Sequence, residues 1–212
     1  MQDLNAFYQS NVKKYNESLI EIKRKLAASS TLRLILFITT IFFGFLFNEN
    51  TKLVLAIAIV GIAVFLYLVS RHTNLRYKRD VIRALKEINE TELQVLDRQF
   101  NQLPTGAEFK DDLHYFSQDI DLFGKGSFYQ YSNRTALKQG STALANLLTE
   151  NSIASIPTKQ KAVQELSEKP DWRQQFAAVA SLTKTETTTT TISNWLENYT
   201  SFVPGIMKFL PS

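Results

Sequence analysis

Cysteine is absent from this chain of 212 residues, and histidine occurs only as His72 and His114. Without thiols the chain forms no disulfide, thiolate nucleophile or iron–sulfur cluster, and two imidazoles leave few ligands for a transition metal. A strong charge of one sign is also missing, because 24 Lys and Arg residues oppose 20 Asp and Glu residues. The resulting formal charge of +4 is too small to indicate a nucleic-acid partner by itself.

The usual catalytic patterns are missing as well. His114 has no marked serine partner, and the phosphate-loop pattern G-x-x-x-x-G-K-[ST] occurs nowhere in the sequence. Asp119 and Asp121 supply only two carboxylates, fewer than a Mg²⁺ or Ca²⁺ site normally uses. The sequence therefore predicts no catalytic residue, bound cofactor or metal ion in this chain.

Long apolar runs, in contrast, are present twice. Residues 34–47 and 53–70 contain no charged side chain, and only five residues separate them. Together with residues 29–33 they predict a transmembrane helical hairpin over residues 29–70, with spans at about 30–47 and 53–70. The alternative is a buried core hairpin of a soluble protein, although few other apolar helices are available to cover it.

Basic residues flank this hairpin on its two outer sides, whereas Lys52 is alone in the turn. By the positive-inside rule, both arms face the cytoplasm, and the hairpin is a multi-pass anchor in the inner (cytoplasmic) membrane. The lipid bilayer is thus the first expected partner, with the basic flanks attracted to anionic headgroups. The flanking cations are Lys13, Lys14, Lys23, Arg24, Lys25, Arg33, Arg71, Arg76, Lys78, Arg79, Arg83 and Lys86.

Apolar residues on both arms recur with spacings typical of coiled-coil helices, which predicts one arm over residues 1–28 and another over 71–102. Two antiparallel arms of one chain can pair, and so can two chains in a homodimer; the sequence leaves both open. The predicted seam comprises Tyr8, Tyr15, Leu19, Ile22 and Leu26 before the hairpin, and Leu75, Ile82, Leu85, Leu93, Leu96 and Phe100 after it.

The rest of the chain predicts short helices and no strand, so the fold class is all-α. Breaker residues end the second arm near Gln102 and begin an irregular connector over residues 103–126. A helical module follows over residues 127–203, with Trp172 and Trp195 expected in its core. Its predicted helices cover residues 127–133, 136–149, a segment from Ser155 with Pro157 in its first turn, 171–182, and a last segment around Ile192, Trp195, Leu196 and Tyr199.

The segment from Asp119 to Thr135 is the most unusual stretch. Gly124 and Gly126 surround a lysine, but without a phosphate-loop pattern they favour a tight turn that leads into the next helix. Arg134 is expected to form a salt bridge with Asp119 or Asp121 in preference to binding a phosphate.

This segment and the helices after it carry an ordered series of motif residues: Asp121, Gly124, Gly126, Ser127, Asn133, Arg134, Thr135, Gly140, Gln160, Val163 and Leu166. In order and spacing they resemble the start of the helical core, or lever, region of MutS-type DNA mismatch-repair ATPases, over about residues 119–182. The sequence departs from that pattern at Asn146, where the family usually has Trp, and at Lys159, where it usually has Arg. With the hairpin before it, the chain looks like a membrane-bound branch of that family.

The resemblance implies a scaffold and transmission role, not catalysis. The family binds ATP and Mg²⁺ in a C-terminal domain that this sequence lacks, and DNA binding is expected only of the full-length protein. We therefore expect an N-terminal part of a longer protein, with residues 204–212 beginning a further apolar segment. The alternative is a membrane-anchored coiled-coil signalling or assembly protein without a nucleic-acid role.

Overall fold

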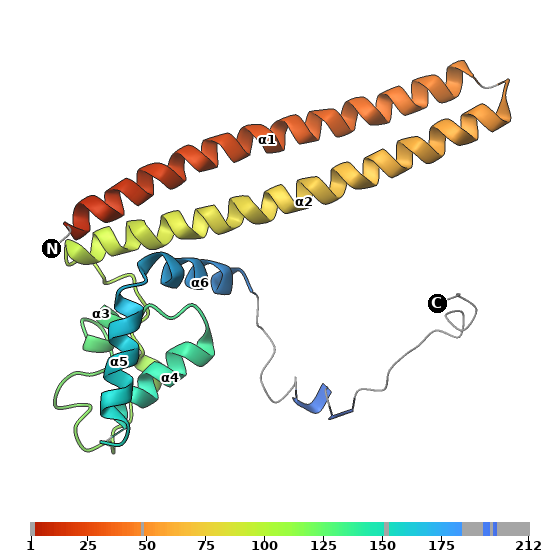
Figure 1. Ribbon diagram of the computed structural model, residues 1–212. Helices are drawn as coiled ribbons and strands as arrows, with labels where there is room; N and C mark the ends of the chain where they lie inside the picture. The colour runs from red at the N-terminus through yellow and green to blue at the C-terminus, as the bar shows by residue number, and fades with distance from the viewer. Residues whose placement is uncertain (1–2, 48, 151–152, 184–192, 196, 199–212) are drawn as a thin grey trace. The chain divides into compact units, whose positions relative to one another are not determined.

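The computed structural model describes residues 3–47, 49–150, 153–183, 193–195 and 197–198. Every regular element in those residues is a helix, in agreement with the predicted all-α class. Two long helices come first, and a connector and four shorter α-helices follow them (Figure 1). The chain divides into two units, residues 1–182 and 183–212, which are described separately.

The two long helices are α1 (Leu4–Leu46) and α2 (Thr51–Leu96). Asp3 caps α1 by accepting a hydrogen bond from the backbone N–H of Asn5 at 3.1 Å, and Asn50 caps α2 through the N–H of Leu53 at 3.3 Å. Since only a short turn joins them, the helices run antiparallel and side by side (Figure 1). Each arm is thus one unbroken helix with its apolar span.

The seam between α1 and α2 contains many of the residues that the sequence predicts. Leu19, Ile22 and Leu85 are buried, and Tyr15 and Ile82 are half-buried. Leu96 is an exception, because it is 42% exposed while its neighbour Val95 is buried. The prediction for Leu96 was wrong: at the last turn of α2, the inward-facing position belongs to Val95.

The α2 helix also ends earlier than predicted, at Leu96 and not near Gln102. Arg98 adopts a left-handed conformation with φ of 61°, and the N–H of Gln99 donates to the carbonyl of Gln94 at 2.8 Å. A second bond joins the N–H of Arg98 to the carbonyl of Val95 at 2.9 Å. These two bonds form a Schellman C-cap, which usually contains glycine where this chain has arginine.

The shorter helices follow the predicted order. They are α3 (Phe128–Ser132), α4 (Lys138–Thr149), α5 (Ile156–Ser167) and α6 (Pro170–Leu182), while the short 3-10 helix η1 (Ala107–Phe109) in the connector was not predicted. Ser127 caps α3 through the N–H of Gln130 at 3.1 Å. Ser155 stands at the start of α5 as predicted, but with φ of 65° its side chain forms no capping bond.

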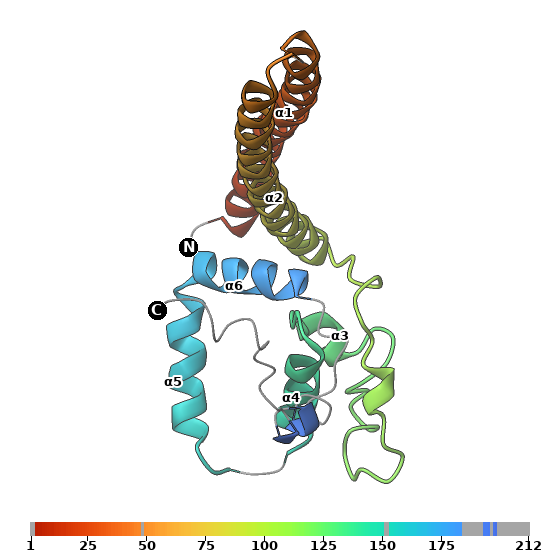
Figure 2. The ribbon, with the colours of Figure 1, turned by 90° about the vertical axis from the view of Figure 1, so that its right-hand side faces the viewer.

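Two separate apolar clusters hold the short helices in place, so these helices do not share one bundle core in the described residues. In the first cluster, α6 packs on α2 (Figure 2), and Ala178 of α6 is fully buried. The second cluster joins the connector to α3 and α4 through Leu122, Phe123, Tyr129 and Ala145. The connector is irregular, as predicted, yet it supplies core residues.

In the second unit, residues 193–195 are helical, and the backbone N–H of Asn198 donates to the carbonyl of Asn194 at 3.1 Å. Trp195 in this turn is mostly exposed, in contrast to the predicted core position. Ile192, Leu196, Tyr199 and the predicted apolar segment 204–212 lie outside the described residues.

Both α1 and α2 contain a stretch that is long and apolar enough to cross a membrane. Only 6% of each stretch is buried against the rest of the protein. A core hairpin of a soluble protein would be covered on most sides, so this exposure favours the membrane interpretation over the core interpretation.

Candidate functional site

A buried cluster of side-chain amides joins three helices near the end of the long pair. Asn89 of α2 is 0% exposed, and its Nδ2 donates to Oε1 of Gln174 on α6 at 2.9 Å. In return, Nε2 of Gln174 donates to Oδ1 of Asn89 at 3.1 Å. The same oxygen accepts from Nδ2 of Asn11 on α1 at 3.1 Å, and Nδ2 of Asn89 also donates to the Leu85 carbonyl at 2.7 Å. We call Asn11, Asn89 and Gln174 the amide cluster.

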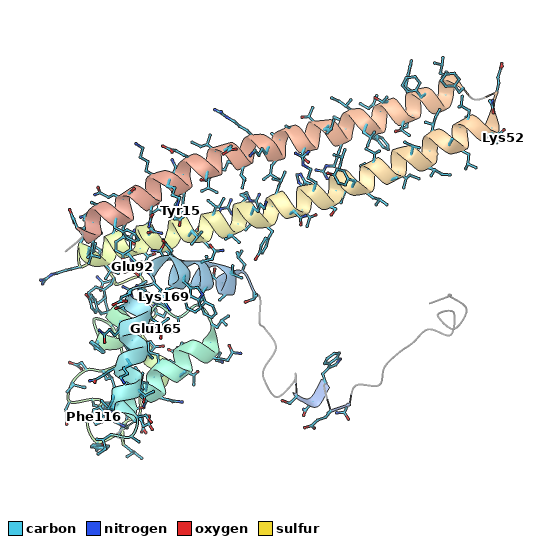
Figure 3. All side chains as sticks on the ribbon, in the orientation of Figure 1. Tyr15, Lys52, Glu92, Phe116, Glu165 and Lys169 are labelled. Carbon is cyan, nitrogen blue, oxygen red and sulfur yellow. The ribbon has the colours of Figure 1, made fainter. Side chains whose placement is uncertain are left out.

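The amide cluster uses the full hydrogen-bonding capacity of the Asn89 side chain, two donors and two acceptor positions. Because a buried amide is costly unless it is paired, this arrangement fixes the register of all three helices. Apolar contacts between Val81, Leu85 and Ala178 surround it. Tyr15 of α1 packs on the same apolar cluster, and burial, followed by the charge of Asp171, raises the pKa of its phenol (Figure 3).

A salt bridge joins the segment after α3 to the same part of α2. Nε of Arg134 lies 2.7 Å from Oε1 of Glu92, and its Nη1 donates to the carbonyls of Tyr131 and Asn133 at 2.8 and 2.9 Å. Arg134 thus forms a salt bridge, but the predicted partners Asp119 and Asp121 were wrong. The true partner is 42 residues away in the sequence, beyond the reach of a local argument.

Beside this salt bridge, Tyr8 near the start of α1 has a raised pKa. Burial is the main cause, and the negative charge of Glu92 adds to it, while Arg173 and Arg134 act in the opposite direction. The three charged residues come from α2, the segment after α3, and α6. Residues from four parts of the chain therefore meet at this end of the long helices.

The motif residues around α3 form a network inside the module. Tyr129 donates from its hydroxyl to the Ser141 carbonyl at 3.3 Å and accepts from Nδ2 of Asn133 at 3.2 Å. Oδ1 of Asn133 accepts from the backbone N–H and hydroxyl of Thr135 at 2.9 and 2.7 Å. Gly140 lies against Thr135, since a Cβ added to Gly140 would stand 3.2 Å from the Thr135 Cβ. These residues have structural roles in the turn between α3 and α4.

Gly124 and Gly126 lie in the predicted turn before α3, with φ of 114° and 77°. Their neighbour Asp121 is exposed and also has a positive φ, at 46°. Gln130, which is fully buried, secures the turn by accepting from the Gly126 N–H at 2.8 Å. Its Nε2 donates to the carbonyls of Asn101 and Leu103 at 3.1 and 2.6 Å, an anchoring role that sequence reasoning missed.

Helix α5 buries none of its residues against the described part of the chain. Gln160, Val163 and Leu166 are therefore exposed, and the structure brings them into no site with the motif residues around α3. Next to α5, Trp172 stacks on Phe176 with ring centroids 5.5 Å apart. Trp172 is 57% exposed, so its predicted core position was wrong: α6 turns Gln174 and Ala178 toward α2 instead.

His114 has a structural environment. Its Nδ1 accepts from the Ser117 N–H at 3.2 Å, which assigns the proton to Nε2 and makes the 3.2 Å contact with the Thr149 carbonyl a donated hydrogen bond. The ring thus ties the connector to the end of α4. In the ranges that the structure describes, no three His, Asp or Glu side chains gather as a metal site would require.

A second polar group, missed in the sequence, lies between the apolar spans and the amide cluster. A Cβ added to Gly61 would stand 2.7 Å from Cγ2 of Thr40, so α1 and α2 approach each other closely there. Ser29 and His72 each lie eleven residues from this contact, which places them at the same level of two antiparallel helices. Arg33 and Arg76 are close enough to His72 to affect its titration. We call Ser29, Arg33, His72 and Arg76 the juxtamembrane cluster.

Several atoms of the juxtamembrane cluster are buried without a partner. Ser29 is 5% exposed, and neither its Oγ, Nε of Arg33 nor Nδ1 of His72 forms a hydrogen bond within the described residues. Each such group costs about 1–3 kcal/mol when left unpaired. Burial lowers the pKa of His72, and the positive charges of Arg33, Arg76 and Arg79 lower it further.

No protein-family model, curated protein or solved structure matches the chain.

Proposed function

We propose that this chain is a membrane-anchored scaffold that holds a cytoplasmic helical module against the arms of a transmembrane hairpin. The observation that carries the proposal is the amide cluster, in which Asn89 of α2 bonds to Gln174 of α6 and to Asn11 of α1 and so links the three helices. A module attached by a flexible tether would not need buried amides at this position. The heptad-like spacing of the seam supports an antiparallel coiled coil between the arms.

Spin labels on exposed positions of α1 and α6 test the scaffold directly. With Lys14→Cys and Gln175→Cys in the full chain, reconstituted in lipid nanodiscs, pulsed electron resonance should give one narrow distance distribution. Both positions are exposed, so the labels leave the packed faces intact. A broad distribution would show that α6 moves freely and would reject the scaffold.

The proposed topology places both arms in the cytoplasm and the turn outside, in a multi-pass inner-membrane anchor. The cysteine-free sequence allows single-cysteine labelling at two exposed positions, Glu49 in the turn and Leu113 in the connector. In intact cells an impermeant maleimide should label Glu49→Cys but not Leu113→Cys. Equal labelling of the two variants would contradict the hairpin.

For the parent protein, we propose a MutS-like class in which a separate domain binds ATP and the full-length protein binds DNA. Support comes from the motif series between Asp121 and Leu166. The exposed face of α5, which includes Val163 and Leu166, is compatible with a larger helical region than the described one. A phosphate loop encoded after Ser212 would support this class, and a reading frame that stops there would leave it without an ATPase.

The described module itself is expected to bind DNA weakly. Three of its cations are neutralised by ion pairs, Arg134 with Glu92, Lys159 with Glu150 and Lys169 with Glu165. Without a continuous basic stripe, we expect binding to duplex DNA no tighter than roughly 10⁻⁴ M at physiological salt. Fluorescence anisotropy with matched and mismatched duplexes measures this, and submicromolar affinity with mismatch preference would reject the expectation.

A signalling or assembly protein without a nucleic-acid role is the second candidate. The exposed stack of Trp172 and Phe176 favours it, since such an aromatic pair is typical of a protein-binding surface. The DNA titration separates the two candidates in the full-length protein.

A further inference from the structure

We propose that the juxtamembrane cluster binds the phosphate of an anionic phospholipid headgroup between α1 and α2. The inference rests on the membrane insertion proposed above, and it adds a specific ligand site to it. The site consists of Ser29 and Arg33 from α1 and His72 and Arg76 from α2.

The position of the cluster in the chain matches the level of lipid headgroups. Arg33 immediately precedes the first apolar run, which starts at Leu34, and His72 follows the second run, which ends at Ser70. In an antiparallel hairpin these two points lie at the same depth, at the boundary between hydrocarbon and water. Basic groups between spans at this boundary are suited to phosphate headgroups.

The unpaired atoms of the cluster have the chemistry that a phosphate needs. Nε of Arg33 and Oγ of Ser29 are buried donors without an acceptor in the described part of the chain, and the His72 ring has a free Nδ1. A guanidinium and a phosphate form paired, charge-assisted hydrogen bonds. One phosphate group would thus satisfy donors from both helices at once.

No carboxylate competes for these cations. Residues 22–48 and 50–79 contain neither Asp nor Glu, so Arg33 has no acidic neighbour on α1, and the carboxylate nearest to Arg76 along α2 is that of Asp80, four residues further on. Arg79 differs, because it pairs with Asp80 at 2.7 Å. Within the described residues, no carboxylate forms an ion pair with Arg33 or Arg76, since Asp80 pairs with Arg79.

The surroundings favour a lipid over a soluble phosphate. Leu34 and Phe37 of α1 and Leu66 of α2 are exposed on the membrane side of the cluster. Acyl chains can cover these side chains while the phosphate contacts Arg33. A free phosphate ion would gain the polar contacts but none of this apolar contact.

Lipid retention tests the site in the full chain. Native mass spectrometry after release from nanodiscs should show retained phosphatidylglycerol in preference to phosphatidylcholine. Arg33→Gln should reduce retention by about tenfold and Ser29→Ala by about threefold, whereas Arg71→Gln, an equal loss of charge outside the cluster, should change it less than about twofold. Equal losses in Arg33→Gln and Arg71→Gln would overturn the site and leave only diffuse attraction.

The two histidines provide a second readout. In nitrogen-15 NMR titrations, phosphatidylglycerol should raise the pKa of His72 relative to phosphatidylcholine nanodiscs, because a nearby negative charge favours the imidazolium. His114 should not respond, and Arg33→Gln should abolish the effect at His72. If inorganic phosphate in phosphatidylcholine nanodiscs gives the same shift, the lipid source is rejected. Labelling of Glu49→Cys tests insertion separately, so failure of the hairpin is distinguishable from failure of the lipid site.

Discussion

The two halves of the α1–α2 helix pair differ in how their side chains are buried and packed. In the half that contains the turn, most of the long apolar side chains are exposed, and Gly61 makes a close contact between the helices. In the other half, Leu19, Ile22, Val81 and Leu85 are buried and a third helix, α6, packs against α2. Small residues bring helices together in lipid, whereas apolar burial drives packing in water. The difference agrees with the proposed hairpin, in which one half lies in lipid and the other half lies in water.

The largest effect on stability is expected for a substitution in the half of the helix pair that contains the amide cluster. Asn89→Ala leaves Asn11 and Gln174 without their central partner, so we expect a loss of roughly 3 kcal/mol in the stability of the arm and α6. Thermal unfolding followed by circular dichroism measures it. Asn16→Ala, at an exposed position on α1, is the matched control and should be within about 0.5 kcal/mol of neutral. Equal effects of the two changes would remove the role assigned to the amide cluster.

Within the apolar half, Gly61→Leu should separate the helices. A Cβ at Gly61 would stand 2.7 Å from Cγ2 of Thr40, so a larger side chain forces the spans apart, at a cost of about 1–3 kcal/mol. Cysteine cross-linking between the spans in membranes should fall accordingly. Gly44→Leu has open space around it and is the control. Unchanged cross-linking in Gly61→Leu would show that the half of the pair that contains the turn does not depend on close packing.

Loss of the salt bridge at the base of the arms should have a smaller effect. Arg134→Gln removes the ion pair with Glu92, and because both side chains are partly exposed we expect about 0.5–1 kcal/mol. Hydrogen exchange should rise in the segment between α3 and α4 more than in α2. Lys138→Gln is the control, because Lys138 lies in the same module and forms no ion pair in the described residues. An equal rise in hydrogen exchange in Lys138→Gln would show that the Arg134–Glu92 ion pair does not stabilise this segment.

The smallest expected effect concerns pH. Folding lowers the pKa of His72, so the neutral imidazole stabilises the folded helix pair at pH values above the ordinary histidine pKa of about 6.5. This stabilisation is lost as the pH falls toward the lowered pKa. Unfolding in phosphatidylcholine nanodiscs should therefore become slightly easier below about pH 6.5. His72→Gln should reduce this dependence. A pH dependence that persists in His72→Gln would place the responsible group elsewhere.

Local sequence signals predicted the positions of the helices better than they predicted the contacts between helices. Ser127, Pro157 and Gly124 mark helix starts and turns through their own backbone preferences, and the structure has helices α3 and α5 where they indicated. The end of α2 was missed because Arg98 occupies a left-handed position that usually belongs to glycine. The sequence offered no sign of this exception.

The contacts of the candidate site depend on pairs that are distant in the sequence. Asn89 and Gln174 are 85 residues apart, and Arg134 and Glu92 are 42 apart. Asn89 lies between apolar positions of a helix, and such an asparagine indicates a buried polar pair. Its partner Gln174 could not be predicted, because the pairing depends on how α6 folds back on α2. Trp172 shows the same limit, since its exposure follows from which face of α6 meets α2.

The continuity of α1 has a geometric consequence. Its 43 residues contain no proline, and its one glycine, Gly44, is near the turn. The helix is about 64 Å long, and in the proposed membrane hairpin a bilayer core of about 30 Å would cover less than half of it. A stiff rod of this kind acts as a lever: a change of tilt of about 10° would shift its far end sideways by about 6 Å. A change in bilayer thickness changes the tilt of spanning helices, so it would move Tyr8 sideways.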